Sequence, residues 1–324
     1  MAGFRRSAVR KSLEVIRGKK TPFRRDIDLQ SFGHCLEADL LIKRILAAIP
    51  ALILLASVIF IHGIYAKIIV AAVGVLCMHE MLNAVSKTAK PLKIVGYGFS
   101  VLSFPAYQYA HGFAGVAVLY LVAMMCIFVA LVFFERDMND GFMTIFSISY
   151  PGMFYVFLIA IPGVVIDTAP PRILESQILA SQFLMIMAFG AAIVTDTFAY
   201  FTGMLFGRHK LAERISPKKT IEGAVGGTVF GAAGVYLFGS LAQRDFGIDA
   251  PVYWYIVLGI ILPVLAQLGD LTASKVKRKL GVKDYGNIMA GHGGAIDRLD
   301  SLLFVAPAVL AFYRFVVTYG DLFK

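Results

Sequence analysis

Long apolar runs recur along the whole chain, and they constrain its fold more than any other feature. Of the 324 residues, 58% are hydrophobic and only 16% are charged, and the mean hydropathy is +0.75. A water-soluble domain usually has about a quarter of its residues charged. Runs of about 20 apolar residues are long enough to cross the hydrocarbon core of a bilayer as helices. The sequence therefore predicts an all-α, polytopic integral membrane protein.

The runs predict about nine transmembrane helices, and no polar segment between them is long enough to form a soluble domain. We expect a basic N-terminal extension over residues 1–40 and a single membrane-embedded domain over residues 41–324. The expected spans are 44–62, 66–84, 94–110, 113–134, 143–166, 178–206, 221–242, 252–268 and 301–318.

The distribution of basic residues supports this topology and predicts a cytosolic N-terminus. The net charge is +10, and Lys and Arg crowd the first 25 positions and the connections that the nine spans place on the same side. Such a bias marks the cytosolic face of a membrane protein, and a basic stretch before a span favours contact with anionic lipid over binding to nucleic acid. A bacterial cytoplasmic (inner) membrane and an endoplasmic reticulum membrane both fit this pattern, and the compact length without a long cytosolic domain favours the bacterial membrane. The opposite side receives only Lys67, Arg172, Arg244, Arg314 and Lys324.

Several common sites are missing from the sequence. The three cysteines have no paired spacing, which argues against a disulfide framework and a zinc site. There is no phosphate-binding P-loop and no nucleophile elbow. His79 and Glu80 begin like a metalloprotease helix, but Asn83 stands where the second histidine would be.

Two carboxylates fall inside apolar runs. Asp196 lies late in one expected span, and Glu80 lies near the end of another. A carboxylate in hydrocarbon is costly unless it is paired, solvated or protonated. A functional role is favoured for Asp196, with a structural ion pair as the alternative. For Glu80 the two interpretations are evenly balanced.

The polar segment 207–220 is the first of two candidate phosphate sites. Ser216 followed by Pro217 predicts a helix start, which would place Lys218 and Lys219 in the first turn. Free backbone N–H groups and positive charge at a helix start attract phosphate. The alternative is a solvated loop on the cytosolic side.

The polar segment 269–300 gives a stronger signal. Asp270 ends the eighth expected span, and Asp297 and Asp300 would share one helical face at the start of the last. Magnesium prefers one or two carboxylates together with substrate phosphate oxygens. A structural re-entrant loop is the alternative. Between the acids lie Ser274, Lys277, Arg278, Lys283, Asp284, and His292 flanked by Gly291, Gly293 and Gly294.

Three glycines recur at four-residue spacing in the seventh expected span, at positions 223, 227 and 231. This spacing predicts close packing of the helix against a neighbour rather than a ligand site.

The segment 269–300 resembles the phosphatidate cytidylyltransferase (CDP-diacylglycerol synthase) family. The matching positions are Ser274, Lys277-Arg278, Lys283-Asp284, His292-Gly293-Gly294, Asp297-Arg298 and Asp300. Further similarity lies at 216–223, 196–203 and 43–45, so the resemblance covers most of the chain from residue 41. Met289, Ala290 and Ala295 depart from the family pattern but remove no charged group.

The resemblance implies a metal-dependent nucleotidyltransferase whose substrates are CTP and phosphatidic acid. It implies Mg²⁺, with room for a second cation, held by Asp270 and Asp297 with Asp196 and Asp300 in support. It further implies catalytic roles for Lys277, Arg278, His292 and Arg298. Substrate binding would fall to Ser216, Lys218, Lys219, Thr220, Ser274, Lys283 and Asp284.

Two other functions remain open at this stage. A CTP-dependent polyprenol or lipid kinase would share the membrane setting and the nucleotide. An ion or phosphate transporter would use the buried acids as a pathway, although we find no inverted repeats of the kind common in transporters. The family resemblance implies an active site that faces the cytosol and the bilayer, and it is compatible with a homodimer.

Overall fold

The computed structural model describes residues 53, 56–61, 63–164, 173–243, 250–286 and 293–319. All of them belong to one compact unit, Ala47–Lys324. The expected extension 1–40 lies outside the described residues. In chain order the elements are α3 (Gly63–Val85), α4 (Lys93–Tyr109), α5 (Phe113–Phe133), α6 (Met138–Ser147), the π turn η1 (Ile148–Met153), α7 (Phe154–Ala160), the 3₁₀ turn η2 (Ile161–Gly163), α8 (Ile173–Phe206), β1 (Lys210–Ala212), β2 (Ser216–Thr220), α9 (Ile221–Ala242), α10 (Tyr253–Lys279) and α11 (Ile296–Tyr319).

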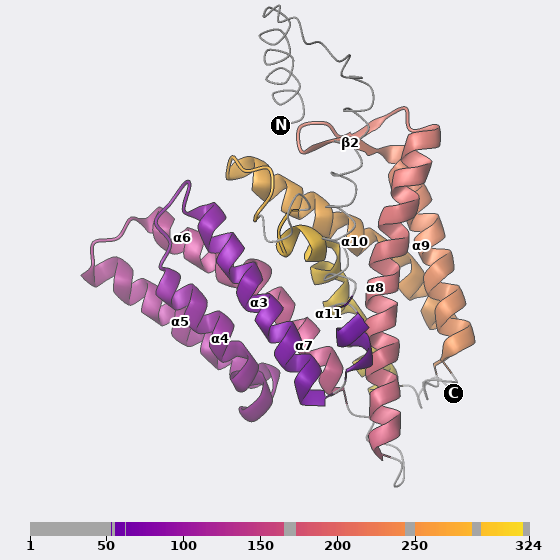
Figure 1. The fold of residues 1–324 in the computed structure, drawn as a ribbon, viewed down its shortest axis with the longest axis horizontal. Helices are drawn as coiled ribbons and strands as arrows, with labels where there is room; N and C mark the ends of the chain where they lie inside the picture. The colour runs from indigo at the N-terminus through magenta and orange to yellow at the C-terminus, as the bar shows by residue number, and fades with distance from the viewer. Residues whose placement is uncertain are drawn as a thin grey trace, which may run out of the picture. The chain divides into compact units, whose positions relative to one another are not determined.

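The helices form two groups that meet along α11 (Figure 1). The helices α3 to α7 pack together as one group, and α8, α9 and α10 form the other. The last helix, α11, contacts α3 and α7 on one side and α8 and α10 on the other. This central position lets the first turn of α11 meet side chains from both groups.

Six described helical segments are long and apolar enough to cross a membrane. They are Gly63–Val85, Phe113–Phe133, Met138–Gly163, Ala180–Phe206, Ile221–Leu241 and Val252–Lys279. On α5, large apolar side chains such as Val118, Leu121 and Met125 are more than half exposed, as lipid-facing residues are. The structure confirms an all-α membrane protein, and the described residues add one small hairpin to the helices.

The full count of nine spans stays a prediction. The expected span 94–110 is a helix of 17 residues, and 301–318 lies within α11, but neither is among the six. The expected span 44–62 lies largely outside the described residues.

The predicted helix start at Ser216 is wrong. Residues Ser216–Thr220 form β2, which pairs antiparallel with β1. Pro217 suits this short strand because its fixed φ is compatible with extended backbone. Helix α9 begins at Ile221 instead, where the Thr220 hydroxyl accepts a hydrogen bond from the backbone N–H of Gly223 at 3.1 Å. The cap is therefore Thr220, four residues after the predicted one.

The helix predicted over residues 252–268 is longer than predicted. Helix α10 continues to Lys279, so Ser274, Lys277 and Arg278 lie on its last turns rather than in a loop. Helix α11 already begins at Ile296, so Asp297 and Asp300 are both helical, as the spacing requires for one shared face.

The glycine spacing in α9 does mark close helix packing. A Cβ atom at Gly223 would lie 2.7 Å from the Ala199 carbonyl oxygen, and one at Gly227 would lie 2.8 Å from the Thr195 carbonyl oxygen. The α8 backbone can approach α9 this closely only because these positions have no side chain. The packing prediction for the three glycines is confirmed.

Candidate active site

Four aspartates from three helices face one region at one end of the bundle. We call Asp196 of α8, Asp270 of α10, and Asp297 and Asp300 of α11 the acid cluster. The charges of Asp196 and Asp270 act on one another, and both act on Asp300. The fold thus brings together acids that are 104 positions apart in the printed sequence, from 196 to 300.

Glycine at position 269 lets α10 and α11 approach closely at the acid cluster. A Cβ at Gly269 would clash with the backbone carbonyl oxygen of Asp300. The absence of a side chain there permits the crossing, and it places Asp270, the next residue, against the first turns of α11. Close backbone contact therefore decides which acids become neighbours.

Asp297 is the most extensively bonded acid of the cluster. Its Oδ1 accepts a hydrogen bond from Lys277 Nζ at 2.7 Å, and the Asp297 side chain is only 8% exposed. Its Oδ2 accepts from the backbone N–H groups of Tyr285 and Gly294, both at 2.9 Å. One carboxylate thus joins the end of α10 to the chain on both sides of residues 287–292.

Tyr285 supports the same junction with its side chain. Its hydroxyl donates to the Ala273 carbonyl oxygen at 3.1 Å, and Lys277 Nζ lies 5.7 Å from the centre of its ring. Burial raises the pKa of the Tyr285 phenol well above its usual range, and the charges of Asp297 and Asp300 raise it further. The phenol is therefore neutral and remains a hydrogen-bond donor.

Asp270 connects α10 to the hairpin. Its Oδ2 forms an ion pair with Lys219 Nζ at 2.5 Å, and its Oδ1 accepts a hydrogen bond from the Ser274 hydroxyl at 3.3 Å. Arg278 Nε donates to the Ile215 carbonyl oxygen at 3.3 Å, which holds the hairpin against the same helix. The two polar segments singled out in the sequence therefore meet.

Asp196 and Asp300 lie at the crossing of α8 and α11. The Ser301 hydroxyl donates to Asp196 Oδ2 at 3.1 Å, and the Ser301 backbone N–H donates to Asp300 Oδ1 at 2.8 Å. Asp300 is 9% exposed. Ser301 was not singled out from the sequence, although it directly follows the acid motif.

Glu80 holds the start of α11 from the other helix group. Its two carboxylate oxygens accept the backbone N–H groups of Ala295 at 2.9 Å and Ile296 at 3.0 Å. Glu80 is 2% exposed, and a Cβ at either Gly286 or Gly294 would clash with its carboxylate. The first amides of a helix have no intrahelical partner, so a carboxylate there satisfies them and complements the helix dipole. Glu80 therefore positions the start of the helix that carries Asp297 and Asp300.

The remaining predicted residues divide into two groups. Lys219 and Lys277 contact the acid cluster, and Ser216, Thr220, Ser274 and Arg278 shape the hairpin and α10 around it. Lys218, Lys283, Asp284 and Arg298 are all exposed. His292 lies outside the described residues.

The acid cluster offers oxygen ligands of the kind that Mg²⁺ takes. Within the described parts of the chain, no three His, Cys, Asp or Glu side chains are grouped tightly enough to hold a metal ion by themselves. Mg²⁺ is usually held by one or two carboxylates, with water and phosphate oxygens completing the shell. The donor set fits such a shared site but not an all-protein cage.

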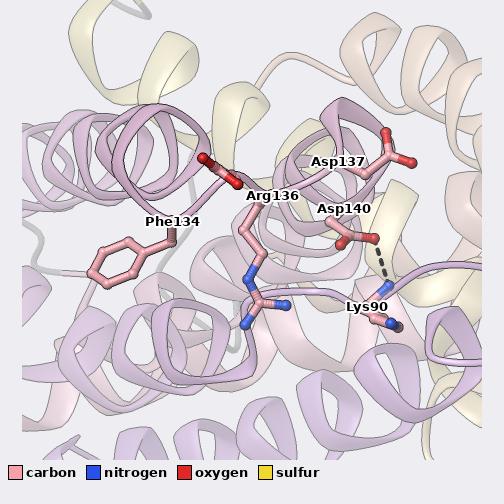
Figure 2. Close-up of a pocket in the computed structure, with 6 residues that line it drawn as sticks. Lys90, Phe134, Arg136, Asp137 and Asp140 are labelled. Carbon is pink, nitrogen blue, oxygen red and sulfur yellow. Dashed lines mark hydrogen bonds between the residues drawn. The ribbon is translucent and has the colours of Figure 1, made fainter.

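A cavity of about 520 Å³ lies elsewhere, between the connections that follow α3 and α5 (Figure 2). It is lined by Lys90, Phe134, Glu135, Arg136, Asp137 and Asp140, and Asp140 Oδ1 accepts the Lys90 backbone N–H at 2.6 Å. None of these residues belongs to the acid cluster, so the cavity is separate from the candidate active site.

Known proteins with similar sequences share one activity in their names. The model of the Cytidylyltransferase family matches residues 42–316. A phosphatidate cytidylyltransferase of Bacillus subtilis (strain 168) is 31% identical over 280 residues, which cover 82% of this chain and 94% of the relative. The enzyme of the same name from Staphylococcus aureus (strain COL) is 32% identical over 272 residues, covering 82% of this chain and 95% of that protein. A third, from Haemophilus influenzae, is 37% identical over 135 residues, or 42% of this chain and 47% of the relative.

Proposed function

Because the chain belongs to the Cytidylyltransferase family, we propose that it is a phosphatidate cytidylyltransferase. It would convert CTP and phosphatidic acid into CDP-diacylglycerol and pyrophosphate, a step of phospholipid synthesis. The observation that carries the proposal is the meeting of two polar segments at membrane helices, where Lys219 pairs with Asp270 and Lys277 with Asp297.

The reaction needs positioning and charge neutralisation more than a strong base. A phosphate oxygen of phosphatidic acid attacks the α-phosphorus of CTP, and the bond from that phosphorus to the oxygen of the β-phosphate breaks. Pyrophosphate leaves with that bonding pair. The attacking phosphate is already anionic, so the chain must chiefly hold the reactants in line and neutralise their charge.

The basic residues at the acid cluster supply part of that charge. Lys219 and Lys277 reach the cluster and would hold phosphate oxygens, while exposed Lys218, Lys283 and Arg298 would attract the nucleotide from solution. Arg278 would act by fixing the hairpin that carries Lys219.

Mg²⁺ fits this site as a partner shared between carboxylates and substrate. Asp270 and Asp297 would hold it first, with Asp196 and Asp300 in support, and a second cation fits the same acidic surroundings. The ion would supply positive charge against the triphosphate and the attacking phosphate.

The membrane setting suits a two-tailed lipid that stays in the bilayer. We propose nine spans, with the N-terminus and the acid cluster on the cytosolic side of a bacterial inner membrane, because the basic connections share that side. The acid cluster then faces a compartment that contains CTP. A homodimer stays a prediction from the sequence.

The test uses purified protein, phosphatidic acid, Mg²⁺ and CTP labelled on the α- or the γ-phosphorus. We expect α-label in the lipid and γ-label in pyrophosphate. If γ-label enters phosphatidic acid or a polyprenol instead, the protein is a lipid kinase. If neither label moves, the transporter alternative returns.

A further inference from the structure

Tyr150 occupies a break in the helix between α6 and α7. Its backbone is extended, with φ −131° and ψ 117°, inside the π turn Ile148–Met153. Pro151 follows directly, and the residue before a proline is disfavoured in the helical conformation, so the chain kinks at Tyr150. Tyr150 is 5% exposed.

The ring of Tyr150 is packed in place by three phenylalanines. The ring centres of Phe146, Phe154 and Phe304 lie 6.0, 6.0 and 6.2 Å from that of Tyr150. Phe304 lies on α11, one helical turn after Asp300, so the contact places Tyr150 beside the acid-bearing end of that helix.

The hydroxyl of Tyr150 differs from those of two nearby buried tyrosines. Among the described residues it has no hydrogen-bond partner. In contrast, the Tyr155 hydroxyl donates a hydrogen bond to the Ser100 carbonyl oxygen at 2.8 Å. The Tyr285 hydroxyl donates a hydrogen bond to the Ala273 carbonyl oxygen. Buried hydroxyls are normally paired because an unpaired one loses its bonds to water without replacement.

The Tyr150 hydroxyl lies within electrostatic reach of the acid cluster, as its ring contact with Phe304 of α11 requires. The groups whose charges act on it are Tyr285, Asp300, Cys77 and Asp270. Two of these are the acids at the crossing of α10 and α11, and one is the tyrosine that supports Asp297. A neutral donor at this place suits an anion held by the neighbouring lysines.

We propose that Tyr150 binds substrate by donating a hydrogen bond from its hydroxyl to a phosphate oxygen at the acid cluster. The inference rests on the proposed function only for the identity of the phosphate, which belongs either to the lipid or to the nucleotide. A phenol is uncharged, so it contributes direction to phosphate binding while the lysines contribute charge.

The Tyr150→Phe variant tests this inference, with Tyr155→Phe as the matched control. Each substitution removes one buried hydroxyl and keeps the ring. We expect Tyr150→Phe to lower kcat/KM by about 10- to 100-fold, the size of one hydrogen bond to a charged group. Its melting temperature in detergent stays equal or rises, because the lost hydroxyl has no partner among the described residues. Tyr155→Phe should do the opposite, lowering the melting temperature while kcat/KM stays within about threefold.

The KM values for the two substrates identify which phosphate Tyr150 contacts. A rise confined to the KM for phosphatidic acid assigns it to the lipid, and a rise confined to the KM for CTP assigns it to the nucleotide. Tyr150→Phe overturns the inference if both values of kcat/KM stay within twofold of wild type. It also overturns it if activity and melting temperature fall together, because that pattern is a packing defect.

A binding measurement separates this inference from the proposed reaction. Phosphatidic acid, CTP and inorganic phosphate are each added to wild type and to Tyr150→Phe, and the rise in melting temperature is recorded. If wild type shows no turnover but a rise that the variant loses, the proposed reaction fails and the phosphate contact stands. If wild type turns over and both proteins show equal rises, the reaction stands and the contact is wrong. If wild type shows neither turnover nor a rise, both are wrong.

Discussion

Two lysine–aspartate pairs lie at the acid cluster, and they differ in burial and in the number of bonds they make. The inner junction is Lys277–Asp297, with side chains 15% and 8% exposed, and the outer junction is Lys219–Asp270, at 26% and 29%. Asp297 also accepts hydrogen bonds from two backbone N–H groups, whereas Asp270 accepts, among the described residues, one further hydrogen bond, from Ser274 at 3.3 Å.

This difference in burial and bonding indicates that the two ion pairs have different roles. The inner junction ties α10, α11 and the chain between them together, so its loss would leave buried groups without partners. The outer junction is partly solvated, and such pairs stabilise a fold by only about 0–1 kcal/mol. Lys219 can therefore exchange Asp270 for a substrate phosphate at little cost to the fold.

The largest effect is expected from breaking the inner junction with Asp297→Asn. The amide cannot accept all three hydrogen bonds, and it leaves Lys277 without its charge partner. We expect the free energy of unfolding to fall by about 3–5 kcal/mol and turnover to fall to background. Thermal melting in detergent and CTP-dependent lipid labelling measure the two. Asp137→Asn, at the exposed start of α6, is the control. Near-normal turnover would remove Asp297 from the site.

Breaking the outer junction should lower activity while changing stability little. Asp270→Asn is expected to reduce turnover by about 100-fold or more, as the loss of a charge-stabilising group does. The free energy of unfolding should change by less than about 1 kcal/mol, because the pair is partly exposed. Urea unfolding followed by tryptophan fluorescence compares this variant with Asp297→Asn. Equal destabilisation of the two would mean that the junctions do not differ in role.

A smaller effect is expected when the hydrogen bonds between Glu80 of α3 and the start of α11 are weakened. In Glu80→Gln one acceptor oxygen becomes an NH₂ group, which cannot accept the N–H of Ala295 or Ile296. We expect a loss of roughly 1–3 kcal/mol in stability and about tenfold in kcat, with little change in KM.

Two glycine variants check the same contact without changing Glu80. Gly294→Ala pushes a methyl group against the Glu80 carboxylate and should reproduce the loss in kcat. Gly98→Ala, where the added methyl group meets nothing within 4 Å, should leave kcat unchanged. If the two behave alike, contact with Glu80 does not limit turnover.

The smallest effect concerns the two lysines of the hairpin. Successive side chains of a strand point to opposite faces, and only Lys219 reaches Asp270. Lys219→Ala should raise the KM for CTP by about tenfold, and Lys218→Ala by about two- to threefold, because a solvated charge is screened. Steady-state kinetics at low and high salt measure both, and salt should abolish the Lys218 effect first. A larger effect from Lys218 would reverse this assignment of strand faces.

Local sequence patterns predicted the helical spans better than the polar segments between them. The ends predicted for 221–242 agree with α9, because a change in hydropathy marks the end of a span. The start predicted at Ser216 failed because a Ser-Pro pair suits a strand as well as a helix, and contacts with α10 favour the strand. The polar character of Ser274 and Lys277 hid the continuation of α10, since a helix can extend beyond its apolar part.

The sequence by itself determined the membrane class, the helical character and the family, because run length, residue type and motif spacing are local properties. It also singled out all four acids of the cluster. Only the tertiary structure decided the pairings of Lys219, Lys277 and Glu80, whose partners come from other elements. Glu80 and Ala295 are 215 residues apart. Such contacts depend on how closely helices cross, as at Gly269 and Asp300, and close packing of whole helices sets that distance.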